Sequence, residues 1–136
     1  SASAPIAQGS HSTLVSAWST TRTRIVQAAA ADSRTAKAAI VVTDPIALKW
    51  LKVCWEAPGE GNCGRCSKCL MTMSNFAAIG AFELVAPRFR APLTPTAIRH
   101  LDLSRTAVGS LTLLRQEAVL LPDGVIRDAW QDSLSG

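Results

Sequence analysis

The sequence has no tyrosine, and its aromatic residues are limited to four tryptophans and three phenylalanines. Charged residues make up only 18% of the 136 residues, which is low for a surface that is solvated on every side. A hydrophobic share of 48% is nevertheless sufficient for a folded core. We therefore expect residues 1–136 to form a single domain or fragment, part of whose apolar surface meets a partner or another part of the same protein.

Long uninterrupted apolar segments are also missing. The longest apolar stretch, residues 37–55, is interrupted by Asp44, Pro45 and lysines, so it is not expected to cross a membrane. The first ten residues are polar and lack the apolar segment of a signal peptide. The net charge of +4 is carried by scattered arginines and lysines, so charge does not demand a nucleic-acid partner.

Several motifs of catalytic sites are absent too. The sequence contains no G-x-x-x-x-G-K-[ST] phosphate loop, no G-x-S-x-G nucleophile turn and no H-E-x-x-H zinc helix. The two histidines, His11 and His100, are far in sequence from every thiol, and each is interpreted as an ordinary exposed residue. No catalytic residue is assigned, although a reactive Cys–His pair remains an alternative.

All four cysteines lie between residues 54 and 69, in the spacing C-x8-C-x2-C-x2-C. A disulfide between any two of them would close a short loop, and the stabilisation by a disulfide grows with loop length. Four soft ligands on short loops suit a tetrahedral metal site better. The spacing therefore predicts one structural zinc ion, with disulfides or free buried thiols as alternatives. The predicted ligands are Cys54, Cys63, Cys66 and Cys69.

The residues between the cysteines indicate how the thiols come together. Gly64 permits the tight turn of a Cys63–Cys66 knuckle, because glycine tolerates a positive φ. Cys66 and Cys69 are expected in the first turn of a helix, whose positive end stabilises thiolates together with Arg65 and Lys68. Four cysteine ligands leave no position for water, so the site predicts structure rather than catalysis. Thiols used for metal binding also fit a reducing, cytoplasmic location.

Periodicity and capping residues predict a mainly α-helical chain with one or two short strands and a four-cysteine zinc knuckle. Residues 1–12 are expected to be flexible, residues 13–93 to form the zinc-bearing core, and residues 94–136 to form a helical tail. A strand is predicted at residues 23–28 because they include β-branched side chains. Met71, Met73 and Phe76 are expected in the core. The predicted helices cover residues 33–43, 45–50, 66–79, 94–100, 104–120 and 125–134, with a surface connector at 81–93.

The cysteine spacing, with its CGRC knuckle, resembles the zinc motif in the C-terminal part of 7-cyano-7-deazaguanine synthase and related PP-loop ATPases. The wider context is similar to a set of bacterial PP-loop-like proteins, in which GSH…WST…I-V…SR-x2-K precedes VCW…NCG-x-C-x-KC-x2-TM. The resemblance covers about residues 9–82. The matching residues are Gly9-Ser10-His11, Trp18-Ser19-Thr20, Ile25-Val26, Ser33-Arg34 with Lys37, and Val53-Cys54-Trp55 onward to Thr72-Met73.

This resemblance implies the C-terminal part of an α/β PP-loop fold, from a protein that activates its substrate by adenylation with ATP. The S-G-G-x-D-S pyrophosphate loop of the family is absent here. ATP would therefore be a cofactor only if such a loop lies upstream in the parent protein, and this chain alone is expected to be inactive. The expected partner is a missing N-terminal half or another protein subunit. The alternative is a stand-alone zinc-stabilised module that binds protein or nucleic acid.

Overall fold

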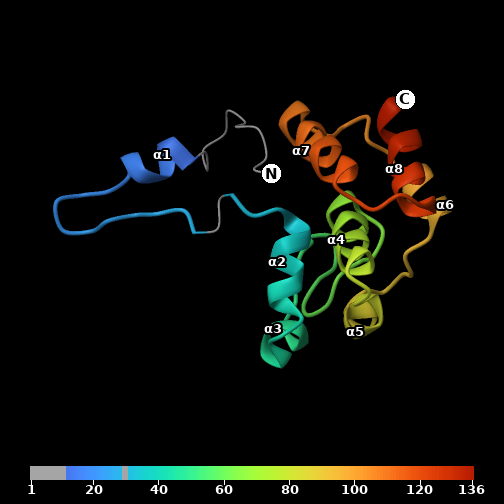
Figure 1. Ribbon diagram of the computed structural model, residues 1–136, viewed down its shortest axis with the longest axis horizontal. Coiled ribbons are helices and arrows are strands. Elements are labelled where there is room, and N and C mark those ends of the chain that lie inside the picture. Colours follow the sequence, from blue (N-terminus) through green and yellow to red (C-terminus); the bar gives the residue numbers. More distant parts are fainter. Residues whose placement is uncertain (1–11, 29–30) are drawn as a thin grey trace.

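The computed structural model describes residues 12–28 and 31–136, which form helices joined by irregular segments (Figure 1). Within these residues the only β pairing is one isolated parallel bridge, between Asn62 and Phe89. The mainly helical prediction is thus confirmed. The helices are α1 (Ser12–Ala17), α2 (Arg34–Val41), α3 (Pro45–Lys49), α4 (Ser67–Ala78), α5 (Phe82–Val85), the 3-10 helix η1 (Ala86–Arg88), α6 (Pro95–Arg99), α7 (Val108–Val119) and α8 (Val125–Ser135).

The strand predicted at residues 23–28 is wrong. These residues are exposed and irregular, and no neighbouring strand pairs with them in the described part of the chain. Because a lone strand leaves its backbone groups unpaired, β-branched residues cannot form one without a partner. The predictions for residues 1–11, including the interpretation of His11, lie outside the described residues.

Helix α4 lies between α2 and the C-terminal helices, at the centre of the helical part formed by residues 34–136 (Figure 1). It is buried over residues 69–76, with α2 packed on it and α5, α6 and α7 also in contact. Met71, Met73 and Phe76 are at most 2% exposed, so their expected place in the core is confirmed. The buried residues of α4 also include Thr72, Ser74 and Asn75, and each of these polar side chains has a hydrogen-bond partner.

Three of the helices that begin where the sequence predicts have a polar side chain as their cap. Ser33 caps α2 by accepting a hydrogen bond from the Ala36 amide, and Asp44 caps α3 by accepting from the Ile46 amide. Thr94 caps α6 in the same way. A short polar side chain at this position satisfies an amide that has no partner inside the helix.

Two other predictions of secondary structure need correction. Helix α7 begins at Val108 rather than at Ser104, whose amide instead donates to Asp102 in a turn. The connector at residues 81–93 contains α5 and η1, and it is partly buried. Val85 and Phe89, which are 0% and 8% exposed, hold it against the core.

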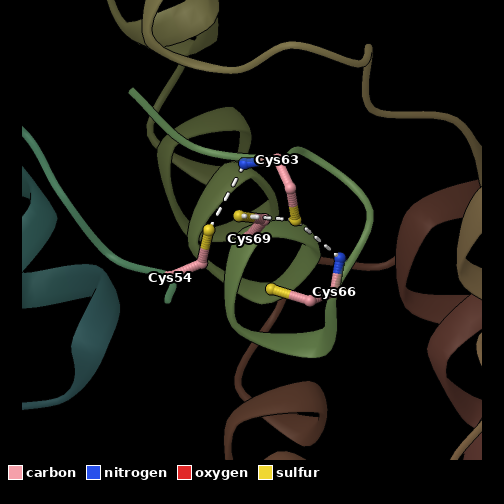
Figure 2. A group of neighbouring side chains, drawn as sticks. All are labelled: Cys54, Cys63, Cys66 and Cys69. Atoms are coloured by element: carbon pink, nitrogen blue, oxygen red, sulfur yellow. Dashed lines mark hydrogen bonds between the residues drawn. The ribbon is translucent and has the colours of Figure 1, made fainter. Parts of the chain in front are cut away.

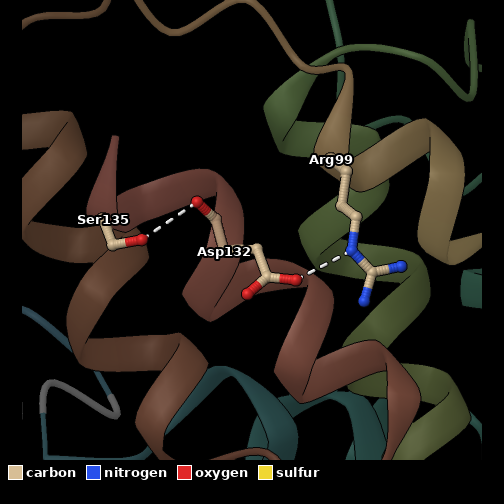
Figure 3. A network of polar contacts seen from close by, with 3 residues as sticks. All are labelled: Arg99, Asp132 and Ser135. Atoms are coloured by element: carbon tan, nitrogen blue, oxygen red, sulfur yellow. Dashed lines mark hydrogen bonds and ion pairs between the residues drawn. The ribbon is translucent and has the colours of Figure 1, made fainter.

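The C-terminal helices are joined to α4 and to one another by side-chain contacts. The indole Nε1 of Trp130 on α8 donates to Ser74 Oγ on α4 at 2.9 Å, and both residues are buried. Figure 3 shows Arg99 of α6 pairing with Asp132 of α8, at 2.8 Å between Nε and Oδ2. The ion pair is exposed and contributes at most about 1 kcal/mol, so the buried Trp130 is the stronger link.

Residues 12–28, which we call the arm, lie away from the rest of the molecule (Figure 1). Almost all of their side chains that the structure describes are exposed, and Trp18 is 71% exposed. Within the described ranges, no helix combines the length and the apolar character needed to cross a membrane.

Candidate metal centre

The four cysteines meet at the N-terminal end of α4 (Figure 2). Their Sγ atoms all lie within 4.8 Å of one another, and those of Cys63 and Cys69 are 3.7 Å apart. A tetrahedron with zinc–sulfur bonds of about 2.3 Å has sulfur atoms about 3.8 Å apart. All four cysteines are free rather than disulfide-bonded. The arrangement therefore fits a single ion with four sulfur ligands.

Three separate parts of the chain supply the thiols. Cys54 ends an extended segment, Cys63 and Cys66 form the knuckle, and Cys69 lies in the first turn of α4. Cys66 occupies the N-cap position, one residue before the helix, and makes no side-chain cap hydrogen bond. The predicted knuckle and helix start are thus present, and the group brings these three segments together.

The knuckle depends on Gly64 for two reasons. Its φ is +75°, as its place in a tight turn predicts. A Cβ at this position would also lie 2.6 Å from the carbonyl oxygen of Ala91 and 2.7 Å from its nitrogen. The second reason is a close approach between two backbone segments, which the local sequence does not reveal.

Backbone amides point at the sulfur atoms. The Cys63 amide donates to Cys54 Sγ at 3.3 Å, and the amides of Arg65 and Cys66 donate to Cys63 Sγ at 3.4 Å each (Figure 2 draws the bonds of Cys63 and Cys66). Hydrogen bonds of this kind favour the thiolate over the thiol. The thiolate is the form of cysteine that binds a metal cation.

The surroundings shift the thiol pKa values in opposite directions. Burial alone would raise the pKa of Cys54, but hydrogen bonds from backbone amides, chiefly those of Cys63 and Ala57, lower it to about 6. Burial raises the pKa of Cys66 and of Cys69 above the usual value of a thiol. A bound dication would supply the positive charge that the buried thiolates otherwise lack.

Asn62 is a structural residue of the site that the sequence interpretation missed. It is fully buried, and its Oδ1 accepts from the amides of Val53 and Cys54, at 2.7 and 3.3 Å. Its Nδ2 donates to the carbonyl oxygens of Leu51 and Arg88, at 2.9 and 3.1 Å. Asn62 therefore holds the Cys54 segment against the knuckle. Its one signal in the sequence is its position directly before Cys63.

Two lysines pack around the cysteine group. Lys52 Nζ donates to the carbonyl oxygens of Ala57 and Gly61 at 2.7 Å each, which closes the loop between Cys54 and Cys63. Lys68, which we expected to assist the thiolates, has its Nζ 4.5 Å from the ring centroid of Trp55. Trp55 itself is 86% exposed, so this cation–π contact lies on the surface beside the site.

Other chemistry finds little support here. Residues 59–64 have the G-x-G-x-x-G spacing of dinucleotide-binding loops, but that motif works directly after a strand. In this chain irregular structure precedes it, and two of its positions belong to the knuckle. His100 is exposed at the end of α6, and the hydrogen bonds of the four thiols in the described part of the chain involve backbone amides and other thiols.

The site thus defines a helical protein with a partly buried group of four thiols that could hold a metal ion. Comparison with known proteins identified no relative, since no family model, no curated protein and no solved structure matches the chain. The function must therefore be argued from the residues themselves.

Proposed function

We propose that Cys54, Cys63, Cys66 and Cys69 hold one structural zinc ion. The observation that carries the proposal is the convergence of four sulfur atoms within 4.8 Å of one another, from three segments of the chain. Four thiolates around zinc close the coordination sphere, so the ion cross-links the chain and does not activate water. Free thiols in this arrangement suit a reducing compartment, and we place the protein in the cytoplasm.

Metal analysis of the purified chain tests this directly. We expect about one zinc per chain, and we expect a strong chelator to lower the melting temperature, because the energy of zinc binding stabilises the folded state. Thiol titration before and after chelation is the internal control, since four thiols should become reactive only when zinc leaves. Protein that is free of zinc, with four reactive thiols and an unchanged melting temperature, would refute the proposal.

We further propose that this zinc-bearing unit is the C-terminal part of a PP-loop-type enzyme that adenylates its substrate with ATP. Support comes from the residues that carry the resemblance, because separate parts of the motif meet in space. Arg34 Nη2 donates to Thr72 Oγ1 at 3.2 Å, which joins the SR and TM stretches. Asn62 of the NCG stretch binds the amides of the VCW stretch. On this proposal ATP binds upstream, and the zinc holds the end of the fold in shape.

The full reading frame distinguishes this proposal from the zinc proposal. An S-G-G-x-D-S-like loop upstream, together with release of pyrophosphate from ATP by the longer protein, is expected. A complete reading frame without such a loop would refute the PP-loop proposal and would not affect the zinc proposal.

A second candidate function is a stand-alone, zinc-stabilised module that binds protein or nucleic acid. The observation that favours it is the exposure of Trp18, Trp50 and Trp55, at 71%, 54% and 86%. Acrylamide quenching of tryptophan fluorescence separates the two functions. If these tryptophans are protected from quenching in the longer protein without any added partner, the result supports the enzyme part. If they are protected only after a separate macromolecule is added, the result supports the module.

A further inference from the structure

Glu117 of α7 is a buried acid with an unused acceptor. The residue is 4% exposed, and its Oε2 has no hydrogen-bond partner in the part of the chain that the structure describes. A buried carboxylate oxygen without a partner costs stability. Such a group calls for an explanation, and the cysteine site does not supply one, because it does not involve Glu117.

Glu117 lines a cavity of about 460 Å³ between the first turns of α4 and the helix α7. This volume is within the range of about 300–1,000 Å³ that is typical of small-molecule sites. Met71, Leu113 and Leu114 contribute apolar surface to the lining. Eight of the twelve lining residues are polar or charged, so the cavity combines a small apolar wall with many polar groups.

Three cations line the same cavity from three parts of the chain: Arg34 at the start of α2, Lys68 on α4, and Arg105 in the turn before α7. None of them takes part in the ion pairs found in residues 12–28 and 31–136, which join Arg99 to Asp132 and Arg127 to Asp123. Arg34 Nη2 donates to Thr72 Oγ1, and within the described residues the structure gives its guanidinium no other hydrogen bond.

The acidic neighbours of these cations do not neutralise them fully. Glu56 is the other acid in the lining, so three cations face two carboxylates. Asp102, whose pKa is lowered by hydrogen bonds from Ser104 and further by Arg105, competes for Arg105 from the exposed turn. Asp102 is outside the lining, and among the lining residues alone the excess of one positive charge favours an anionic group in the cavity.

We propose that this cavity binds a small zwitterion, in which an oxyanion pairs with Arg34 and Arg105 and an ammonium group pairs with Glu117. An anion alone would leave Glu117 without a partner, and a cation alone would face three positive charges. The apolar lining accepts the hydrocarbon part of the molecule. The oxyanion is a carboxylate or a phosphate, since arginine binds both. The proposal does not depend on which metal the cysteines hold.

Titration calorimetry on the full chain, as purified with its metal, tests the site with matched probes. L-leucine carries both charges, N-acetyl-L-leucine only the carboxylate, and L-leucinamide only the ammonium. O-phosphoethanolamine replaces the carboxylate with a phosphate and identifies the oxyanion. We expect saturable binding of at least one zwitterion, and single-charge probes about tenfold weaker or more, because a hydrogen bond to a charged group is lost.

Glu117→Gln should weaken binding of the zwitterion by about tenfold or more, whereas Glu83→Gln on the exposed surface of α5 should not change it. Arg105→Gln should weaken it as well, with Arg22→Gln on the arm as the matched control. Glu117→Gln should also melt at the same or a higher temperature, because no hydrogen bond of Oε2 is removed.

Three results would each overturn the proposal. The first is the absence of saturable binding by either zwitterion. The second is equal binding by the single-charge probes or by the Glu117→Gln protein. The third is a lower melting temperature for Glu117→Gln, which would show that Glu117 has a stabilising partner within the chain.

Discussion

At Gly64 the backbone passes so close to Ala91 that one added carbon atom does not fit. We predict that Gly64→Ala destabilises the protein by more than the cost of a left-handed residue alone, which is about 1–2 kcal/mol. Gly59→Ala is the matched control, because Gly59 also has a positive φ, of +67°, but a Cβ there would have no neighbour within 4 Å. Chemical denaturation and zinc content measure the difference. Equal losses in the two variants would contradict the close approach.

Cys66→Ser separates the role of the metal from that of the helix start. Serine is a good N-cap residue, and Cys66 makes no side-chain cap hydrogen bond, so this change should not weaken α4 itself. We predict that the variant nevertheless loses zinc and melts at a lower temperature, since three thiolates bind zinc less tightly than four. Ser67→Ala next to it is the control. Unchanged zinc content and melting temperature would show that Cys66 is not a ligand.

Residues differ in how far their roles can be predicted from sequence. The four thiols and Gly64 were predictable, because ligand spacing and turn geometry are local properties. Asn62 and Glu117 were not, since their roles come from contacts with segments far along the chain. A polar residue shows from its sequence that it can form hydrogen bonds, but not that it is buried or which partners it has.

Among the helices, the predictable ones begin with a local signal. The caps at Ser33, Asp44 and Thr94 act within three residues, and sequence predicts them correctly. Helix α7 begins after Ala107, which offers no side-chain cap, so its start was placed at Ser104 instead. The short helices of residues 82–88 were missed because packing of Val85 and Phe89 against the core, rather than capping, stabilises them.

The contact between α4 and α8 provides a test of how the tail is held. Ser74→Ala leaves the buried Nε1 of Trp130 without its acceptor, so we predict a loss of about 1–3 kcal/mol of unfolding free energy. Ser135→Ala is the control, because Ser135 is exposed and its hydroxyl donates to the Asp132 carbonyl oxygen (Figure 3), so its removal should cost about 0.5 kcal/mol or less. Denaturant unfolding of both variants measures the effect, and equal stabilities would mean that Trp130 finds another acceptor.

In the whole molecule, a compact part built around α4 contrasts with an exposed arm (Figure 1). The cysteine group lies at the N-terminal end of α4. Helices α6 and α7 contact α4, and α8 packs on α6 and α7 and reaches α4 through Trp130. The proposed zinc ion therefore joins the Cys54 segment and the knuckle to the start of α4. A chain with short helices and no sheet in its described part is expected to gain stability from such a cross-link.

The arm should be dispensable for this compact part. We predict that deletion of residues 1–28 leaves zinc content and melting temperature unchanged, because the arm residues that the structure describes bury little apolar surface. Deletion of residues 124–136 is the contrasting variant and should prevent stable folding, since it removes the fully buried Trp130. A lower melting temperature without the arm would show that it packs on the compact part. An unchanged temperature would show that the exposed Leu14, Trp18 and Val26 do not stabilise the compact part.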